Sequence, residues 1–193
     1  MRCVWSVMLL AGAVVGSGCD AGPRGPDPVG PGVPAFSQAG GVGLLADGGG
    51  RYAIGAIIGR FSLSAGQGDA QQAGGEFRHR VDFGGGLVAD FHGRVTCLAV
   101  DPAQHRAWIG GVVTRNASTD PDLLQAIHAP GRDVWFRVVD YGSGDGAPPD
   151  RTTFVGFEGA GGILTSAAYC AARIWPDGDA RTWPVTGNLT VLP

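Results

Sequence analysis

The stretch Gly75-Glu-Phe-Arg-His-Arg-Val-Asp-Phe83 alternates apolar or ring-bearing side chains with charged ones at every position after the glycine. A period of two is typical of a β-strand that turns one face to a core and the other to water. The stretch therefore predicts a sheet protein with one-sided strands. It also puts His79 on the apolar face, where a core histidine is more common than a metal ligand.

On both sides of this stretch, short β-prone runs are broken by Gly, Asp and Pro. The strands expected from these runs cover residues 41–45, 52–63, 75–83, 87–100, 107–115, 133–141, 152–157, 163–175 and 185–192. Residues 121–128 alone suggest a helix, because Asp120 can cap it and Pro121 suits its first turn. We expect an all-β domain over residues 39–193: one antiparallel barrel or sandwich of about seven to nine strands, with one short helix near 121–128.

Three motifs in this region resemble a group of secreted or lipid-anchored bacterial domains whose function is uncharacterised. The motifs are G-x-V-T-C-L-x-V at 93–100, A-x-I-G-G-x-V at 107–113 and V-V-D-x-G at 138–142. Residues 185–191 are similar to the closing strand of the same group, so the likeness runs over roughly residues 50–193. The resemblance implies a β-domain outside the cytoplasm and implies no chemistry.

The amino terminus reads as an export signal. Arg2 precedes an apolar run at 4–15, and the small residues Gly16-Ser17-Gly18 stand directly before Cys19. This resembles a bacterial lipoprotein signal, which implies cleavage after residue 18 and acyl chains such as palmitate on Cys19. Gly16 stands where such signals usually carry a branched apolar residue, and an ordinary secretory leader cleaved near the same place is the alternative. We expect a lipid-anchored protein of the bacterial cell envelope, or else a secreted one.

Residues 19–38 are rich in Pro and Gly and have little apolar surface to bury, which predicts a disordered tether after the lipidated cysteine. The chain has no Lys. From Cys19 onward it has thirteen arginines against seventeen acids, a net charge of −4. That balance indicates neither a nucleic-acid partner nor attraction to an anionic membrane surface, since both require clustered positive charge. The expected contact with a membrane is through the lipid anchor.

Two cysteines remain in the predicted domain, Cys97 and Cys170. An exported protein folds under oxidising conditions, which favours a disulfide between them. Two buried free thiols are the alternative.

The loop from Asp140 to Asp150 offers the best candidate for a bound ion. Asp140, Asp145 and Asp150 lie among glycines, and carboxylate and carbonyl oxygens are the ligands of Ca²⁺. The acids are five residues apart, unlike those of an EF-hand, and the same composition suits a plain hairpin loop. Calcium is the one cofactor that the sequence suggests, and the pattern is too weak to assign these residues as a metal site.

The four histidines show no metal-ligand spacing. Asp90 and His92 share one face of a strand and could act as a base with its orienting group, but no nucleophile motif accompanies them. No catalytic residue is predicted. A small extracytoplasmic hydrolase is the alternative function, and it would require two or more of Asp82, Asp90, His79 and His92 to converge in a concave site.

Trp183 stands beside Pro184 in a polar stretch, and is the tryptophan expected to be exposed and available to a ligand. Burial in the β core is the competing interpretation. We expect a non-enzymatic structural, adhesive or ligand-binding module, whose partner is a cell-wall glycan, a lipid or another protein.

Overall fold

The computed structural model describes residues 43–68, 72–157, 159 and 162–193. All of them belong to one compact unit, Val33–Pro193. The expected signal peptide at 1–18, Cys19 and the tether at 19–38 lie outside the described residues.

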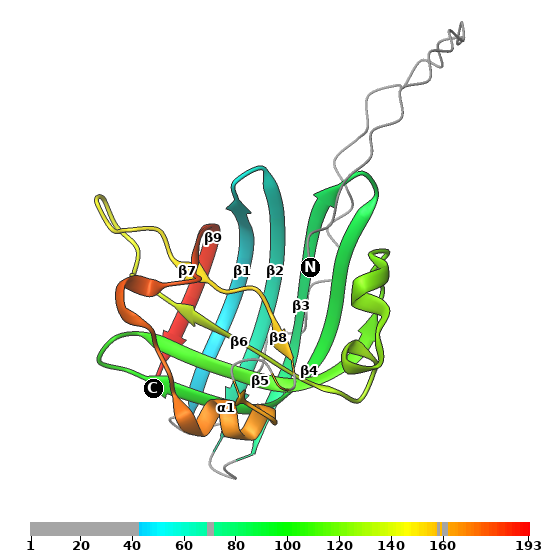
Figure 1. The fold of residues 1–193 in the computed structure, drawn as a ribbon. Helices are drawn as coiled ribbons and strands as arrows, with labels where there is room; N and C mark the ends of the chain where they lie inside the picture. The colour runs from blue at the N-terminus through cyan, green and yellow to red at the C-terminus, as the bar shows by residue number, and fades with distance from the viewer. Residues whose placement is uncertain (1–42, 69–71, 158, 160–161) are drawn as a thin grey trace, which may run out of the picture. The chain divides into compact units, whose positions relative to one another are not determined.

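The described residues form an antiparallel β-barrel, as expected from the alternating sequence pattern (Figure 1). Its strands are β1 (Leu44–Ile54), β2 (Ile57–Gln67), β3 (Ala73–Gly84), β4 (Leu87–Asp101), β5 (Arg106–Asn116), β6 (Asp133–Val139), β7 (Arg151–Thr152), β8 (Gly156–Phe157) and β9 (Trp183–Leu192). Strands β1 to β5 pair in chain order, and the circuit closes through β6, the two-residue β7 and β9, which pairs with β1. Eight strands thus close the barrel, and β8 adds a ninth beside β6.

One expected strand, over residues 52–63, is wrong. The chain reverses between Ile54 and Ile57, which face each other as the last pair of the β1–β2 hairpin. Gly55 in this turn has a φ of +62°, a conformation that glycine adopts without steric cost. Gly55 therefore marks a reversal of the chain, where one continuous strand had been expected.

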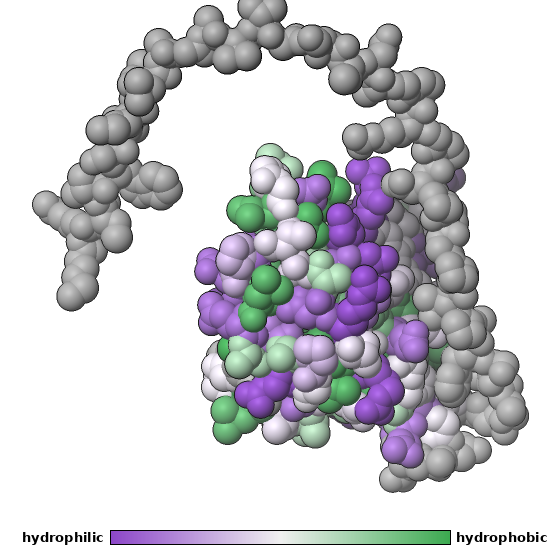
Figure 2. All heavy atoms as spheres, turned by 90° about the vertical axis from the view of Figure 1, so that its right-hand side faces the viewer, coloured by the Kyte–Doolittle hydropathy of each residue, from purple (hydrophilic) through white to green (hydrophobic). Residues whose placement is uncertain are grey.

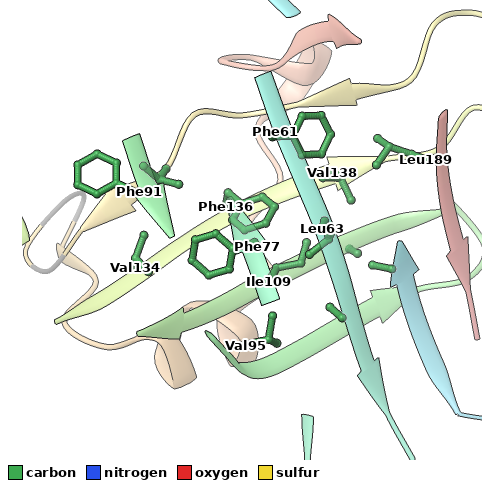
Figure 3. Packing of buried hydrophobic residues seen from close by; sticks show 14 of the residues in the cluster. Phe61, Leu63, Phe77, Phe91, Val95, Ile109, Val134, Phe136, Val138 and Leu189 are labelled. Carbon is green, nitrogen blue, oxygen red and sulfur yellow. The ribbon is translucent and has the colours of Figure 1, made fainter. Parts of the chain in front are cut away.

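The barrel interior is filled by side chains that alternate along each strand (Figure 3). Aromatic rings dominate its centre: Phe77 and Phe136 meet edge to face at 5.1 Å, and Phe91 meets Phe157 at 4.9 Å. An eight-stranded barrel has an interior just wide enough to be packed in this way. The alternation is confirmed from Glu76 to Asp82, because Phe77, His79 and Val81 all point into this core, whereas Phe83 at the end of the stretch is exposed.

Glycines opposite aromatic residues make room for the rings. Tyr52 faces Gly59 across β1 and β2, and Phe77 faces Gly93 across β3 and β4. A Cβ on Gly59 would stand 2.3 Å from the Tyr52 ring, and one on Gly93 would stand 2.1 Å from the Phe77 ring. These glycines are therefore part of the packing, since each gives a neighbouring ring its place on the sheet.

A second apolar cluster lies outside the barrel wall, beneath the helix α1 (Ser166–Ala172). A strand had been expected at 163–175, and that prediction is wrong. Thr165 caps the helix by accepting a hydrogen bond from the Ala168 amide, and the buried residues Ser166, Tyr169 and Cys170 follow the helical period. The run is also rich in alanine, the best helix former.

The disulfide between Cys97 and Cys170 joins α1 to β4, with the two Cα atoms 6.2 Å apart. The cysteines are 73 residues apart in the chain. The bond indicates a non-reducing, extracytoplasmic setting for the domain.

The helix expected near 121–128 forms as two 3₁₀ turns, η1 (Pro121–Leu124) and η2 (Ala126–His128). Gln125 between them is extended and interrupts the helix. The expected cap is present, because the Asp120 side chain accepts a hydrogen bond from the Asp122 amide. The residues of both turns remain at least partly exposed, although Leu123 and Ile127 pack against the barrel core.

Candidate functional site

A cavity of about 410 Å³ opens on the outside of the barrel, where β1 lies between β2 and β9. Its lining residues are Arg51, Tyr52, Ala53, Ile58, Pro184 and Thr186. A volume of this order suits a small organic ligand. Most of the lining is apolar, while the guanidinium of Arg51 and the hydroxyl of Thr186 are groups that can bind a phosphate or carboxylate.

Arg51 is exposed, and within the described residues its side chain has no hydrogen bond or ion pair. Along the neighbouring strands it faces Arg60 of β2 and Thr186 of β9. The cavity therefore carries one uncompensated positive charge at an apolar surface. That combination fits a ligand with an anionic group and an apolar body.

Trp183, the tryptophan expected to be exposed, is partly buried and packs against the barrel core. Its ring stacks on Tyr52, with the centroids 6.3 Å apart and an angle of 25° between the planes. Tyr52 and Pro184 both line the cavity. Trp183 therefore does not line the cavity itself, but it contacts Tyr52 and precedes Pro184, which do.

His79 lies fully buried inside the barrel, between Phe61 and Phe136 at centroid distances of 5.4 and 4.5 Å. Neither of its ring nitrogens, nor the buried hydroxyl of Tyr52 nearby, has a hydrogen-bond partner among the described residues. Burial lowers the pKa of His79 to about 3, so the ring is neutral at pH 7. His79 is a core histidine.

On the outer face of β3 and β4, two arginines bind Asp90. Arg78 donates to both carboxylate oxygens at 2.9 and 2.7 Å, and Arg80 donates to one at 3.0 Å. Burial by itself would raise the pKa of Asp90, but these hydrogen bonds and the nearby positive charges outweigh it, and the pKa is lowered. Asp90 is therefore ionised and held as the acceptor of an arginine fork.

His92 stands beside this group, with its Nε2 atom 3.4 Å from Asp90 Oδ1. Burial and the neighbouring charge of Arg78 lower the pKa of His92, and Nε2 makes no hydrogen bond within the described part of the chain. His92 is therefore close to Asp90 but neutral at pH 7, and the two side chains do not form an ion pair. The proximity expected of Asp90 and His92 is confirmed, although arginines already occupy both carboxylate oxygens.

Of the four residues of the hydrolase alternative, only Asp90 and His92 are in contact within the described part of the chain. His79 points into the barrel, while Asp90 and His92 lie on its outer surface. Asp82 is exposed and accepts a hydrogen bond from the Gly84 amide. None of the four lines the cavity beside Arg51.

The acidic loop is tied to β9 by two of its three aspartates. Asp150 is buried and accepts hydrogen bonds from the amides of Tyr141 and Leu189, at 3.0 and 2.9 Å. Asp140 accepts from the amides of Gly142 and Val191. Asp145 is exposed at the tip of the loop. Two of the carboxylates proposed for calcium thus already bind backbone amides, and calcium at this loop stays a prediction.

Within the described ranges, no group of three or more His, Cys, Asp or Glu side chains is placed to hold a metal ion. Nor does any helix of the described part have the length and apolar character needed to cross a membrane.

This geometry defines the chain as an eight-stranded antiparallel β-barrel domain with a disulfide-bonded outer helix and a shallow cationic cavity. No protein family, curated protein or solved structure matches it. The likeness to envelope domains therefore depends on its sequence motifs alone.

Sequence reasoning missed Arg51 and Thr186. Arg51 follows three consecutive glycines, and no pattern in that run distinguishes it from an ordinary exposed residue. Its importance comes from the pairing of β1 with β2 and β9, which brings Ile58 and Pro184 to its side.

Proposed function

We propose that this chain is a non-enzymatic ligand-binding module of the bacterial cell envelope, held to a membrane by a lipid on Cys19. The binding role is supported by the cavity between β1, β2 and β9, where Arg51, which has no ion pair among the described residues, stands at an apolar wall. Its ligand is a small molecule with a phosphate or carboxylate group and an apolar portion. The disulfide supports the extracytoplasmic location.

The binding role is tested by thermal melting of residues 33–193. This unit contains every described strand of the barrel and every residue of its described core, so we expect it to fold by itself. The probes are decyl phosphate, decanoate, the neutral decyl maltoside and glucuronate. A probe at about 100 times its Kd adds about 2.7 kcal/mol to the free energy of unfolding, which raises the melting temperature by several degrees.

The matched variants are Arg51→Gln in the cavity and Arg94→Gln on β4, an exposed arginine that does not line it. We expect decyl phosphate to stabilise the wild type and Arg94→Gln, and to lose most of its effect in Arg51→Gln. If the four probes leave the wild-type melt unchanged, the small-ligand role is wrong, and a structural or adhesive role replaces it.

The lipid on Cys19 is tested on the full chain in a bacterial host. Intact mass of the mature protein should include acyl chains beginning at Cys19, and Cys19→Ala should release the protein from the membrane fraction. A mature protein without acyl chains would make the chain a secreted one.

A small hydrolase is the second candidate, favoured by the 3.4 Å approach of His92 to Asp90. It predicts turnover of chromogenic esters or glycosides that is lost in both Asp90→Asn and His92→Gln. We expect no turnover, because arginines hold both oxygens of Asp90.

A further inference from the structure

Three large apolar side chains are exposed close to two neighbouring turns at one end of the barrel. Ile58 beside the β1–β2 turn is 39% exposed, and Phe83 and Leu87 on either side of the β3–β4 turn are 39% and 44% exposed. Both turns lie at the same end of the domain, at the top of Figure 1. Figure 2, seen from the β3–β4 side, shows hydrophobic side chains at the upper end of this face, beside a band of hydrophilic ones.

Behind this apolar end, three arginines stand side by side across three strands. Arg51 faces Arg60 in the pairing of β1 with β2, and Arg60 faces Arg80 in the pairing of β2 with β3. All three are exposed. Arg80 binds Asp90, whereas the side chains of Arg51 and Arg60 have no hydrogen bond or ion pair among the described residues.

Like charges directly opposite each other destabilise a sheet. The row therefore does not stabilise the folded domain. An anionic partner would offset the repulsion between the facing arginines. Among the described residues, the acids nearest to the row are Asp82 and Asp90, while Glu76 further along β3 faces Arg94. Asp90 is covered by Arg78 and Arg80, and Asp82 accepts a hydrogen bond from the Gly84 amide. Four guanidinium groups thus stand against two carboxylates, and the surface is locally positive although the whole chain is acidic.

We propose that this end of the barrel docks on the surface of a bilayer that contains anionic phospholipids. Ile58, Phe83 and Leu87 enter the boundary between headgroups and acyl chains, and the arginine row binds the phosphates. Arg60 lies two residues from Ile58 along β2, which is about 7 Å at the rise of a strand. Apolar side chains at a membrane surface enter to a depth of about 5–10 Å, so the arginines stand at the level of the headgroups.

The apolar side chains favour a bilayer over a soluble acidic polymer. A polyanion would use the arginine row alone and would gain nothing from the exposed side chains at the turns. A bilayer uses both, because apolar insertion and attraction between arginines and phosphates add to each other. Docking does not depend on the lipid at Cys19. Ile58 and Arg51 also line the cavity, whereas Arg60, Phe83 and Leu87 do not, so substitutions at these last three residues test docking apart from the cavity.

The test measures co-sedimentation of residues 33–193, which lack Cys19, with vesicles. One set is pure phosphatidylcholine and the other contains about one-third phosphatidylglycerol. We expect binding to the anionic vesicles that weakens steeply as salt rises. Arg60→Gln should weaken that binding about fivefold, the loss of about one arginine contact, and Phe83→Ser with Leu87→Ser should weaken it at least tenfold. Arg94→Gln, which removes the same charge further from the turns, should change it less than twofold.

Equal binding to both vesicle types would overturn the role of the arginines. Absence of binding to either would overturn the docking itself. A soluble polygalacturonate that binds in an Arg60-dependent way, while vesicles do not, would assign the row to a polymer and overturn the bilayer. Arg51→Gln separates this proposal from the cavity. It should remove most of the decyl phosphate shift, while vesicle binding should fall only about fivefold, the loss of one arginine contact.

Discussion

The ring of Phe77 lies against Gly93, the residue directly opposite it in β4, so closely that a Cβ on Gly93 would stand 2.1 Å from the Phe77 Cζ atom. Phe77 in turn contacts Phe136 at the centre of the barrel. The absence of a side chain at Gly93 therefore sets the position of a ring that packs the core.

Gly93→Ala should destabilise the domain by about 1–3 kcal/mol, because the added methyl displaces the Phe77 ring into a packed interior. Denaturant unfolding of residues 33–193 gives the change. Gly74→Ala is the matched control on β3, since a Cβ there meets nothing within 4 Å, and it should have little effect. Equal effects of the two variants would show that the Phe77–Gly93 contact is dispensable.

Removal of the Cys97–Cys170 disulfide should lower the free energy of unfolding by about 4 kcal/mol, since the bond closes a long loop in the unfolded chain. The comparison is between wild type and the Cys97→Ala, Cys170→Ala double variant, each with and without dithiothreitol. The reductant should destabilise only the wild type. Hydrogen exchange in α1 should also rise, because the bond ties this helix to β4. A double variant as stable as the wild type would refute the prediction.

His79 should make the domain lose stability as the pH falls from about 6.5 toward about 3. The unfolded histidine binds a proton near its ordinary pKa of 6.5, while burial holds the folded pKa at about 3. Protons therefore favour the unfolded state across this window, by up to about 1.4 kcal/mol for each pH unit. Asp90 acts at lower pH, because its lowered pKa supplies stability that is lost only below its ordinary value of 3.8.

The measurement is the free energy of unfolding against pH for wild type, His79→Leu and His105→Asn. His79→Leu should flatten the slope between pH 6 and 4, and the exposed His105 should leave it unchanged. A slope that persists in His79→Leu would mean that other groups cause it.

Arg60→Gln should stabilise the isolated domain by about 0.5 kcal/mol at low salt, because it removes a charge that faces arginines on both sides. The gain should shrink in about 0.5 M salt, where surface charges are screened. Arg94→Gln is the control, because Arg94 faces the opposite charge of Glu76. Its removal should not raise the free energy of unfolding. Thermal melts at two salt concentrations decide between these outcomes, and a loss of stability in Arg60→Gln would contradict the prediction.

The strand predictions that were confirmed came from local sequence patterns. Alternation over 75–83 identified β3 and the burial of His79, because a period of two assigns each residue to a face without knowledge of its partner strand. The same logic failed at 163–175, where the small residues of α1 suit either structure and the cap at Thr165 was the deciding signal. It also failed at Gly55, since a glycine in a strand pattern allows a bend or a reversal.

The candidate sites were less accessible from sequence. Net charge argued against an anionic surface partner, but charge along a chain says nothing of its distribution on a folded surface. Arg51, Arg60 and Arg80 come from three strands, and only the register of those strands puts them in one row. The cavity has the same origin, because its lining residues come from β1, β2 and β9.

The sequence by itself determined that this is an all-β domain with one-sided strands, because side-chain alternation and turn residues act over a few positions. It also supplied both cysteines of the disulfide, and its apolar amino-terminal run predicts an export signal that would favour such a bond. Tertiary structure alone decided that the sheet closes into a barrel, that Cys97 and Cys170 meet, and that arginines from separate strands gather at an apolar end. These features depend on strand register, which is set by packing among residues far apart in the chain.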